Sequence, residues 1–332
     1  MAPYRQVPMR RLQMIDRLRQ HWFTLGLFGV VIVSLSGFGL PLGTVIIPIG
    51  VWIIFLAQGV ILGEGSPHSE QNWCGTLTFV LCWNFLLFPL VTVGLLWVTG
   101  LWEQSDFAFG YWLLAFLPTT IASAVAMTSG AGGRVEHALL ATVSSNLFAV
   151  WLVPMIAVFY LAIEAEIEIA LWPLVLRLLI LIVLPLLIGY GLRRFQFPGT
   201  AKLAGVARPL TQGILLLILL VAFSRSFTSG ELTGLNFGAL RELLLVCGAL
   251  VLLVSALVWF SAGRFHFSYH ERISVFYCAS QKSLATGVPM IGSVLLAVGP
   301  ENASAINLLP ILCYSPMQLL LGGYLVPYFS RQ

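Results

Sequence analysis

The stretch Cys278-Ala-Ser-Gln-Lys-Ser-Leu-Ala-Thr-Gly-Val-Pro289 lies within a long apolar segment. A second stretch of the same character, Pro118-Thr-Thr-Ile-Ala-Ser-Ala-Val-Ala-Met-Thr-Ser-Gly-Ala-Gly-Gly133, lies in another apolar segment. Both combine Pro with many Ser, Thr and Gly residues, a composition typical of an interrupted helix. Interrupted helices at membrane depth are tolerated only where they line a cavity or are buried in protein, and their free N–H and C=O groups then become ligands. The two stretches therefore predict two broken helices at one binding site.

The composition of the whole chain indicates that these segments lie in a membrane. Of 332 residues, 59% are hydrophobic and 9% are charged, whereas soluble domains have about 25% charged residues. A soluble domain of this size cannot bury so much apolar surface, so lipid is the expected solvent. We predict an all-α integral membrane protein, with a basic cytoplasmic tail over residues 1–21 and a single polytopic membrane domain over residues 22–332.

Hydropathy predicts about ten transmembrane helices, because a span needs about 20 mostly apolar residues. The predicted windows are residues 22–40, 44–62, 75–97, 111–128, 137–163, 169–192, 208–227, 241–262, 272–297 and 303–328. The first window follows a basic segment and resembles a signal peptide. It lacks a small-x-small cleavage site, so we retain it as a span.

The basic residues are distributed unevenly between the two predicted membrane faces. With the N-terminus inside, thirteen of the 17 Lys and Arg residues fall in cytoplasmic segments, two (Arg225 and Arg241) fall outside, and two (Arg177 and Lys282) lie within spans. An excess of Lys and Arg marks the cytoplasmic side, so we predict that both termini are cytoplasmic. The short loops favour the cytoplasmic (inner) membrane of a bacterial-type cell.

Ten spans divide into two halves of five. Because five is an odd number, the second half would insert upside down relative to the first, which is the inverted-repeat plan of many secondary transporters. The two interrupted stretches then occupy equivalent places, in the fourth and ninth spans. This arrangement predicts a transporter built from two inverted five-helix repeats.

Lys282 is the most informative residue of the chain. A lysine at the centre of a span costs about 2.5–3.5 kcal/mol on insertion scales, so it should face a partner or a wet cavity. An ion pair that packs helices together is one possible role, but the nearest acidic residues, Glu271 and Glu301, belong to the predicted membrane faces. The ammonium could attract an anionic substrate or stand where a metal cation would otherwise bind. Alternatively, burial favours the neutral amine, which would let Lys282 load and release a proton in each cycle.

Arg177 is the other ionisable residue within a predicted span. At the usual rise per residue it lies about 12 Å from the outer end of its helix. Its long stem can extend toward the acidic residues of the loop at 164–168, so we assign it no binding role.

Hydroxyl and amide side chains near the interrupted stretches are the candidate lining of the binding site. Taken singly, such groups in membrane helices more often hold helices together than bind a ligand. Beside a broken helix they become candidate ligands. The candidate substrate- or ion-binding residues are Asn84, Ser123, Thr128, Ser129, Thr142, Ser145, Asn146, Ser280, Gln281, Lys282, Ser283, Thr286 and Gln318.

The sequence offers no pattern for enzyme chemistry, so we expect neither catalytic residues nor a resident cofactor. Both aspartates, Asp16 and Asp106, lie outside the predicted spans, and the five histidines form no His-Glu-x-x-His pattern. The five cysteines form no Cys-x-x-Cys pair, so neither a disulfide framework nor a zinc site is predicted. A net charge of +4, with the arginines at membrane edges, does not indicate nucleic-acid binding.

The interrupted stretches also carry a family resemblance. Residues 117–133 and 276–290, with Leu309-Pro310 followed by Gln318, resemble the bile acid–sodium symporter superfamily, and most closely its SBF-like branch. That branch includes bacterial symporter-like proteins and relatives linked to calcium homeostasis in fungi and animals. The resemblance spans nearly the whole chain. It implies a ten-helix fold with a panel domain and a core domain, in which the broken fourth and ninth helices cross in the core and the two domains alternate by rocking or by an elevator-like movement.

The resemblance also implies a partly lost pair of sodium sites near that crossing. Its polar ligand positions are kept at Ser123, Thr142 and Gln281, which would hold sodium if a residual site persists, and Asn84 stands where relatives carry Gln. Four positions differ from the family pattern: Ala124 replaces an Asn, Ala138 replaces a Ser, Tyr277 replaces the shared acidic ligand, and Lys282 replaces an Asn.

These departures weaken any sodium site, because a hard cation requires oxygen ligands and negative charge. We expect Lys282 to substitute for sodium, giving sodium-independent or proton-linked secondary transport of a small anionic organic solute. Na⁺ and H⁺ both stay open as the coupling ion. The alternative is a membrane regulator of calcium influx that acts through a protein partner, which the sequence does not identify.

Overall fold

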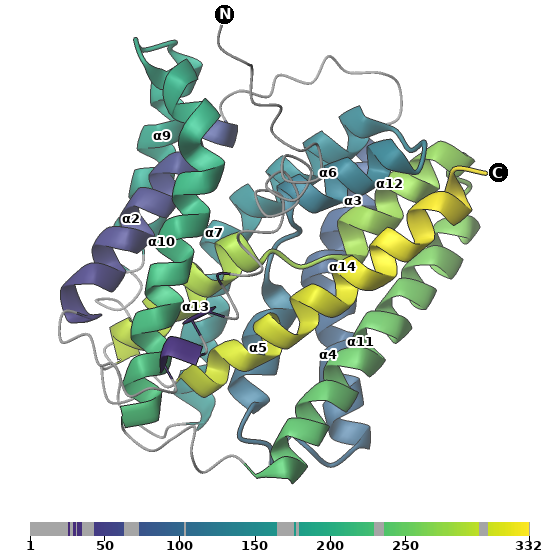
Figure 1. Ribbon diagram of the computed structural model, residues 1–332. Coiled ribbons are helices and arrows are strands. Elements are labelled where there is room, and N and C mark those ends of the chain that lie inside the picture. Colours follow the sequence, from purple (N-terminus) through teal and green to yellow (C-terminus); the bar gives the residue numbers. More distant parts are fainter. Residues whose placement is uncertain are drawn as a thin grey trace, which may run out of the picture.

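The computed structural model describes residues 26, 29–30, 32–34, 43–62, 73–102, 104–164, 176, 179–228, 236–298 and 305–331. All regular structure within these ranges is helical (Figure 1). The basic tail over residues 1–21, most of the first predicted span and Arg177 lie outside the described residues.

Four single helices among the described residues are long and apolar enough to cross a membrane. In the first, α3 (Trp73–Cys82) continues through the π-helix η1 (Trp83–Leu87) into α4 (Phe88–Val98). The second is α7 (Val135–Glu164) and the third is α11 (Phe237–Arg264). In the fourth, the 3₁₀ turn η4 (Ala305–Leu308) continues into α14 (Leu309–Phe329). They match the predicted spans at 75–97, 137–163, 241–262 and 303–328 within a few residues.

Two further spans are bent, which brings the candidate spans among the described residues to six. The helices α5 (Ala108–Phe116) and α6 (Ile121–Gly130) meet at 59°. Helix α10 (Thr200–Thr228) bends by 51° just before Pro209, a residue that cannot donate a helical hydrogen bond.

Helix is interrupted at both stretches that the sequence singled out. The first interruption covers residues 117–120, between α5 and α6, and the second covers residues 281–283, between α12 (Tyr269–Ser280) and α13 (Leu284–Val298). The backbone N–H of Ser283 donates to the carbonyl of Pro118 at 2.8 Å. The two interruptions therefore meet directly in the interior of the protein.

Three helices pack tightly on one side of this crossing (Figure 1): α2 (Gly43–Leu62), α9 (Leu184–Arg194, preceded by the π-helix η2, Leu179–Val183) and α10. A Cβ atom at Gly59 would lie 2.1 Å from the carbonyl of Leu186, and one at Gly189 would lie 2.1 Å from the carbonyl of Leu56. Only glycine fits these two positions, because the backbones of α2 and α9 touch there. Helix α13 contacts both α2 and α10 and so connects this group to the crossing.

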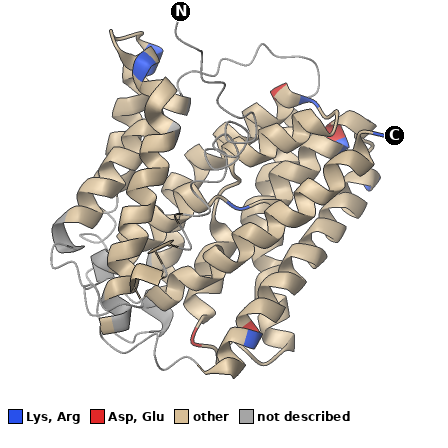
Figure 2. Cartoon of the chain, viewed as in Figure 1, with Lys and Arg blue, Asp and Glu red and all other residues tan. Residues whose placement is uncertain are grey.

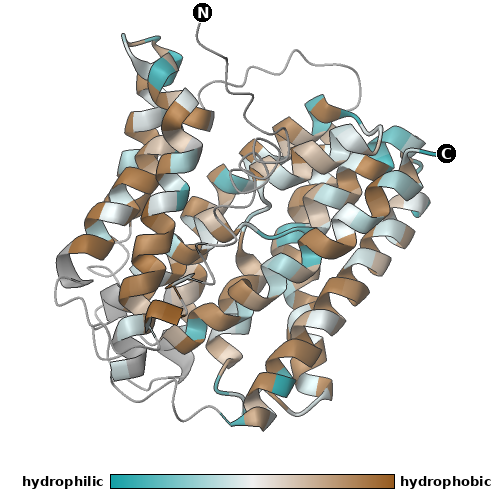
Figure 3. Cartoon of the chain, viewed as in Figure 1, coloured by the Kyte–Doolittle hydropathy of each residue, from teal (hydrophilic) through white to brown (hydrophobic). Residues whose placement is uncertain are grey.

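The surface and the interior fit a protein surrounded by lipid. Large apolar side chains such as Leu252, Phe260 and Trp151 are exposed, and Figure 3 shows hydrophobic residues along the lengths of the helices. Figure 2 shows most of the charged residues at helix ends. Continuous exposed apolar surface of this kind marks a membrane-facing protein.

Candidate functional site

The first interruption leaves backbone carbonyls without helical partners. Proline disfavours helical backbone at the preceding residue, and Leu117, before Pro118, is extended with a ψ of 148°. Because the helix ends there, the carbonyls of Ala115 and Leu117 lack the N–H donors that a continuing helix would supply.

The π-helix η1 leaves a third carbonyl free nearby. In a regular α-helix the carbonyl of Asn84 would accept from the N–H of Phe88, but that N–H donates instead to the carbonyl of Trp83. The next residue, Pro89, has no N–H to offer. The carbonyl of Asn84 therefore needs a donor from elsewhere, which is how π-bulges often serve functional sites.

Lys282 supplies donors to all three carbonyls. Its side chain is 0% exposed, and its Nζ donates to the carbonyl oxygens of Ala115 at 2.8 Å, Leu117 at 2.8 Å and Asn84 at 3.1 Å. Three acceptors require three N–H donors, which the ammonium form provides and the neutral amine does not. The contacts therefore suit a lysine that is charged at this position.

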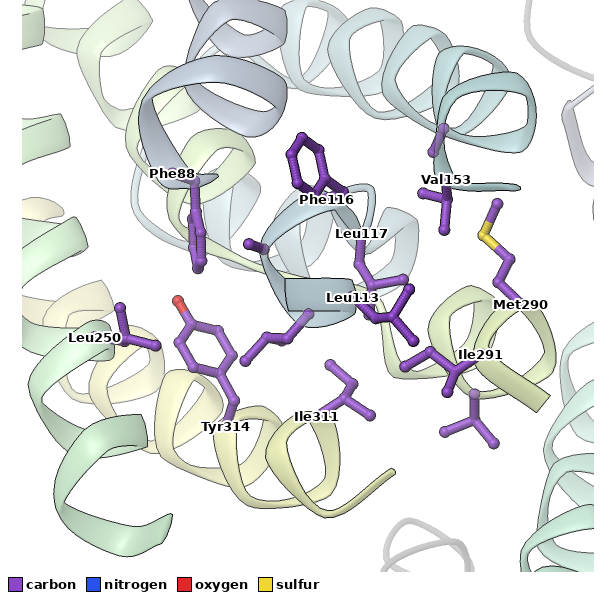
Figure 4. Packing of buried hydrophobic residues seen from close by; sticks show 14 of the residues in the cluster. Phe88, Leu113, Phe116, Leu117, Val153, Leu250, Met290, Ile291, Ile311 and Tyr314 are labelled. Carbon is purple, nitrogen blue, oxygen red and sulfur yellow. The ribbon is translucent and has the colours of Figure 1, made fainter. Parts of the chain in front are cut away.

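An aromatic ring completes the surroundings of the ammonium. Nζ lies 4.1 Å from the centre of the Phe88 ring, at a distance that allows a cation–π interaction. Phe88 in turn packs edge-on against Tyr314, with ring centres 5.8 Å apart, and Figure 4 shows the two side chains facing one another inside the apolar packing that includes Leu113 and Ile311. The charge is thus held in an environment closed to water.

Helix α14 holds the second interruption in place. The side-chain amide of Gln318 pairs with the backbone of Lys282 in both directions: Oε1 accepts from the N–H at 2.7 Å, and Nε2 donates to the carbonyl at 2.7 Å. One turn earlier, the hydroxyl of Tyr314 donates to the carbonyl of Ser280 at 2.8 Å. Backbone groups that the interruption of the helix would leave unpaired are therefore satisfied by side chains.

Helix α7 connects the two interruptions through a polar network. The Nδ2 of Asn146 donates to the carbonyl of Thr119 at 2.9 Å, and its Oδ1 accepts from the hydroxyl of Thr286 at 3.0 Å. The hydroxyl of Ser283 donates to that of Thr286 at 3.1 Å. Ser145 accepts from the N–H of Thr119 at 3.2 Å. The candidate residues Ser145, Asn146, Ser283 and Thr286 therefore lie together.

The three residues named for a residual sodium site do not surround the lysine. Ser123 donates to Oε1 of Gln281 at 2.9 Å, and Nε2 of Gln281 lies 3.1 Å from the sulfur of Met127. Thr142 donates to the carbonyl of Leu139 in its own helix at 2.9 Å. The ammonium of Lys282 lies at the carbonyl end of α5 and forms no hydrogen bond with Ser123, Thr142 or Gln281.

Two other predicted residues lie away from the network. Ser129 is exposed near the far end of α6, and the buried hydroxyl of Thr128 has no hydrogen-bond partner among the described residues. No group of three or more His, Cys, Asp or Glu side chains in the described part of the chain is placed to hold a metal ion.

A small cavity of about 100 Å³ lies on the other side of the crossing. It is smaller than the sites of drug-sized ligands, which measure about 300–1,000 Å³, so it suits a compact ligand. Its lining comes from α2, the start of α6, α10, and the second interruption with the start of α13. The lining residues are Gln58, Ile61, Thr120, Ile121, Ala122, Thr211, Gln212, Ser283, Ala285 and Thr286. Gln58, Thr211 and Gln212 were not among the candidate residues predicted from the sequence. The signal that could have identified them is that each is a polar residue in a mostly apolar predicted span.

Two helices begin at this cavity. Thr120, the residue before α6, makes no side-chain cap, so the first N–H groups of α6 have no such partner. The start of α13 is only partly capped, since Ser283 accepts from the N–H of Thr286 at 3.2 Å. Each helix start carries a partial positive charge of about half an elementary charge. None of the lining residues has an ionisable side chain, so the helix starts supply the charge on the cavity wall itself and favour an anion.

The two sides of the crossing are therefore chemically opposite. The carbonyl ends of α5 and α12, which would attract a cation, are satisfied by Lys282 and Tyr314. The N–H ends of α6 and α13, which would attract an anion, begin at a cavity.

Comparisons with known proteins identify the family of this chain. The SBF-like CPA transporter family matches residues 21–331. The uncharacterized protein PA2026 of Pseudomonas aeruginosa is 29% identical over 287 residues, which cover 86% of this chain and 84% of the relative. Sodium/bile acid cotransporter 7 of Danio rerio is 25% identical over 324 residues, covering 95% of both chains, and its counterpart from Rattus norvegicus is 23% identical over 325 residues, covering 95% and 94%. Because the family match extends over nearly the whole sequence, this chain belongs to the SBF-like CPA transporter family.

Proposed function

We propose that this protein is a secondary transporter that carries a small organic anion across the cytoplasmic membrane by alternating access. The proposal includes ten transmembrane helices in two inverted five-helix repeats, with α2, α9 and α10 in the panel domain and the two interrupted spans in the core domain. Family membership and the meeting of two interrupted helices beside a cavity support it. Substrate sites of secondary transporters lie at such interruptions.

The hydrogen bonds of Lys282 carry the proposal on ion coupling. Its ammonium brings one positive charge to three carbonyl oxygens, the type of ligand that otherwise coordinates a sodium ion. A tethered cation does not leave with the substrate, so the transport cycle requires no sodium. In the proton-linked form of the mechanism, Lys282 releases its proton in one step of the cycle, and one of the carbonyls then loses its donor.

The anion binds at the starts of α6 and α13. An anionic group there accepts from backbone N–H groups at the positive ends of two helices. Regulation of calcium entry through a partner, the alternative function considered from the sequence, gives the cavity no role, and we do not adopt it.

The test is transport by purified protein in liposomes. Currents and uptake are measured after concentration jumps of small organic acids, given as potassium or choline salts, with and without NaCl. We expect acid-dependent transport that is equal with and without sodium, and that is lost in Ala285→Phe, whose larger side chain fills the cavity. Transport that needs sodium would refute the coupling proposal, and transport that survives filling of the cavity would refute the assigned site.

A further inference from the structure

The cavity has a second wall, which the proposed mechanism does not use. Opposite the helix starts it is lined by Gln58 of α2 and by Thr211 and Gln212 of α10. Gln58 is the single polar side chain between Ile46 and Leu62, and Thr211 and Gln212 precede the apolar run Gly213-Ile-Leu-Leu-Leu-Ile-Leu-Leu. Polar side chains in such helices are expected to form hydrogen bonds with a neighbouring helix.

Thr211 forms no such bond. Its side chain is 3% exposed, and its hydroxyl has no hydrogen-bond partner among the described residues. A buried hydroxyl without a partner is unfavourable, whereas a hydroxyl facing a ligand is satisfied when the ligand is bound. Gln58, at 9% exposed, places a mostly buried amide on the same wall.

The chemistry of this wall specifies the part of the ligand that faces it. Amides and hydroxyls both donate and accept hydrogen bonds, so together they match the hydroxyl groups of a ligand. The wall has no cationic side chain, so a second carboxylate would lose its hydration without gaining a countercharge. On this wall the apolar side chain of Ile61 accompanies the three polar side chains.

We infer that the substrate is a compact hydroxylated monocarboxylate, whose hydroxyl groups are recognised by Gln58, Thr211 and Gln212. This inference rests on the proposed function, which assigns the carboxylate to the starts of α6 and α13. A site that hydrogen-bonds a hydroxyl discriminates strongly against the analogue that lacks it, because the buried polar groups of the protein are then left unpaired. The wall on α2 and α10 thereby sets substrate selectivity, while the starts of α6 and α13 bind the carboxylate of the substrate.

The test compares acids of one carbon skeleton. Thermal unfolding of the purified protein in detergent is measured with butyrate (no hydroxyl), threonate (three hydroxyls) and tartrate (two hydroxyls and a second carboxylate), each as its choline salt. Glycerate and gluconate extend the series in size, and neutral threitol carries a hydroxymethyl group in place of the carboxylate of threonate. Ligand binding to the folded state raises the unfolding midpoint, so the midpoint reports relative affinity.

We expect the hydroxylated monocarboxylates to stabilise the protein at concentrations at least tenfold lower than butyrate or tartrate. Thr211→Val, which removes the unpaired hydroxyl at nearly constant volume, and Gln58→Leu should each weaken threonate binding about tenfold and leave butyrate binding unchanged. Thr200→Val is the control on the same helix, because Thr200 does not line the cavity and its hydroxyl is bonded to the carbonyl of Phe197 at 2.8 Å. Its midpoint without ligand should fall slightly, and each acid should raise that midpoint as much as in the wild type.

The outcomes separate this inference from the proposed function. Binding of butyrate or tartrate as tight as that of the hydroxylated monocarboxylates would show that the wall does not select for hydroxyl groups. Wild-type affinity of Thr211→Val for threonate would show the same. In both cases the proposed anion site at the starts of α6 and α13 would remain supported. If threitol binds and no acid does, both the proposed anion site and the inferred monocarboxylate are wrong, and only the recognition of hydroxyl groups by the wall remains. If none of glycerate, threonate and gluconate stabilises the protein, the inference is overturned.

Discussion

Replacing Lys282 by methionine tests how strongly the tethered charge holds the crossing together. Methionine has a similar volume and no donor, so Lys282→Met leaves the carbonyls of Ala115, Leu117 and Asn84 buried without the donors that now lie 2.8–3.1 Å away. Each buried acceptor left without a partner costs about 1–3 kcal/mol. Removing the lysine also removes its cost of membrane insertion, about 2.5–3.5 kcal/mol, and this gain offsets part of the destabilisation.

The balance predicts that Lys282→Met lowers the free energy of unfolding by about 2–4 kcal/mol, within the range seen for broken buried polar networks. The unfolding midpoint should then fall by several degrees. The assay is thermal unfolding in detergent, followed by tryptophan fluorescence. Lys202→Met is the matched control, because Lys202 is exposed on α10. A midpoint of Lys282→Met equal to or above that of the wild type would refute the argument, because the ammonium would then contribute nothing to the packing of the interruptions.

Three further changes test the packing around the site. Gly189→Ala should lower the free energy of unfolding by about 1–3 kcal/mol, because the added Cβ would lie 2.1 Å from the carbonyl of Leu56. Gly191→Ala is the control and should be tolerated, because its Cβ would have no atom within 4 Å. Equal unfolding midpoints for the two variants would contradict the close contact of α2 and α9. Gln318→Leu leaves the N–H and C=O of Lys282 unpaired, and it should lower stability by about 2–4 kcal/mol and reduce transport; full transport at wild-type stability would show that the amide pair does not position the interruption. Tyr314→Phe removes the bond to Ser280 and should lower the free energy of unfolding by about 1 kcal/mol, measured against the exposed control Tyr324→Phe; identical midpoints would rule out that bond.

The interruptions could be predicted from the sequence, since Pro, Gly and hydroxyl residues within apolar segments leave few alternatives in a membrane. The polar residues around them were identified by composition, and the structure brings most of them together. The contacts of Lys282 could not be predicted in this way. They depend on a carbonyl of Asn84 released by a π-bulge, and bulges follow from the register of packed helices, which a hydropathy pattern does not contain.

The polar residues on the second wall of the cavity could not be predicted from the sequence for a related reason. Gln58 and Thr211 belong to two helices that are distant in sequence from the interruptions, and each has the ordinary explanation of helix–helix hydrogen bonding. Only the packing of α2 and α10 against α13 places them on one cavity. Helix faces that meet through tertiary contacts are not encoded in local spacing.

We propose that the charge of Lys282 takes the place of a bound sodium ion. The most direct test is the unfolding midpoint of the wild type and of Lys282→Asn in NaCl and in choline chloride at equal ionic strength. We predict no sodium-specific shift for the wild type. For Lys282→Asn, in which a side-chain oxygen joins three freed carbonyls, we predict a rise of several degrees in NaCl, because a ligand at 100 times its Kd stabilises by about 2.7 kcal/mol. A sodium-specific rise in the wild type, absent from Lys282→Asn, would show that Lys282 does not replace a sodium ion.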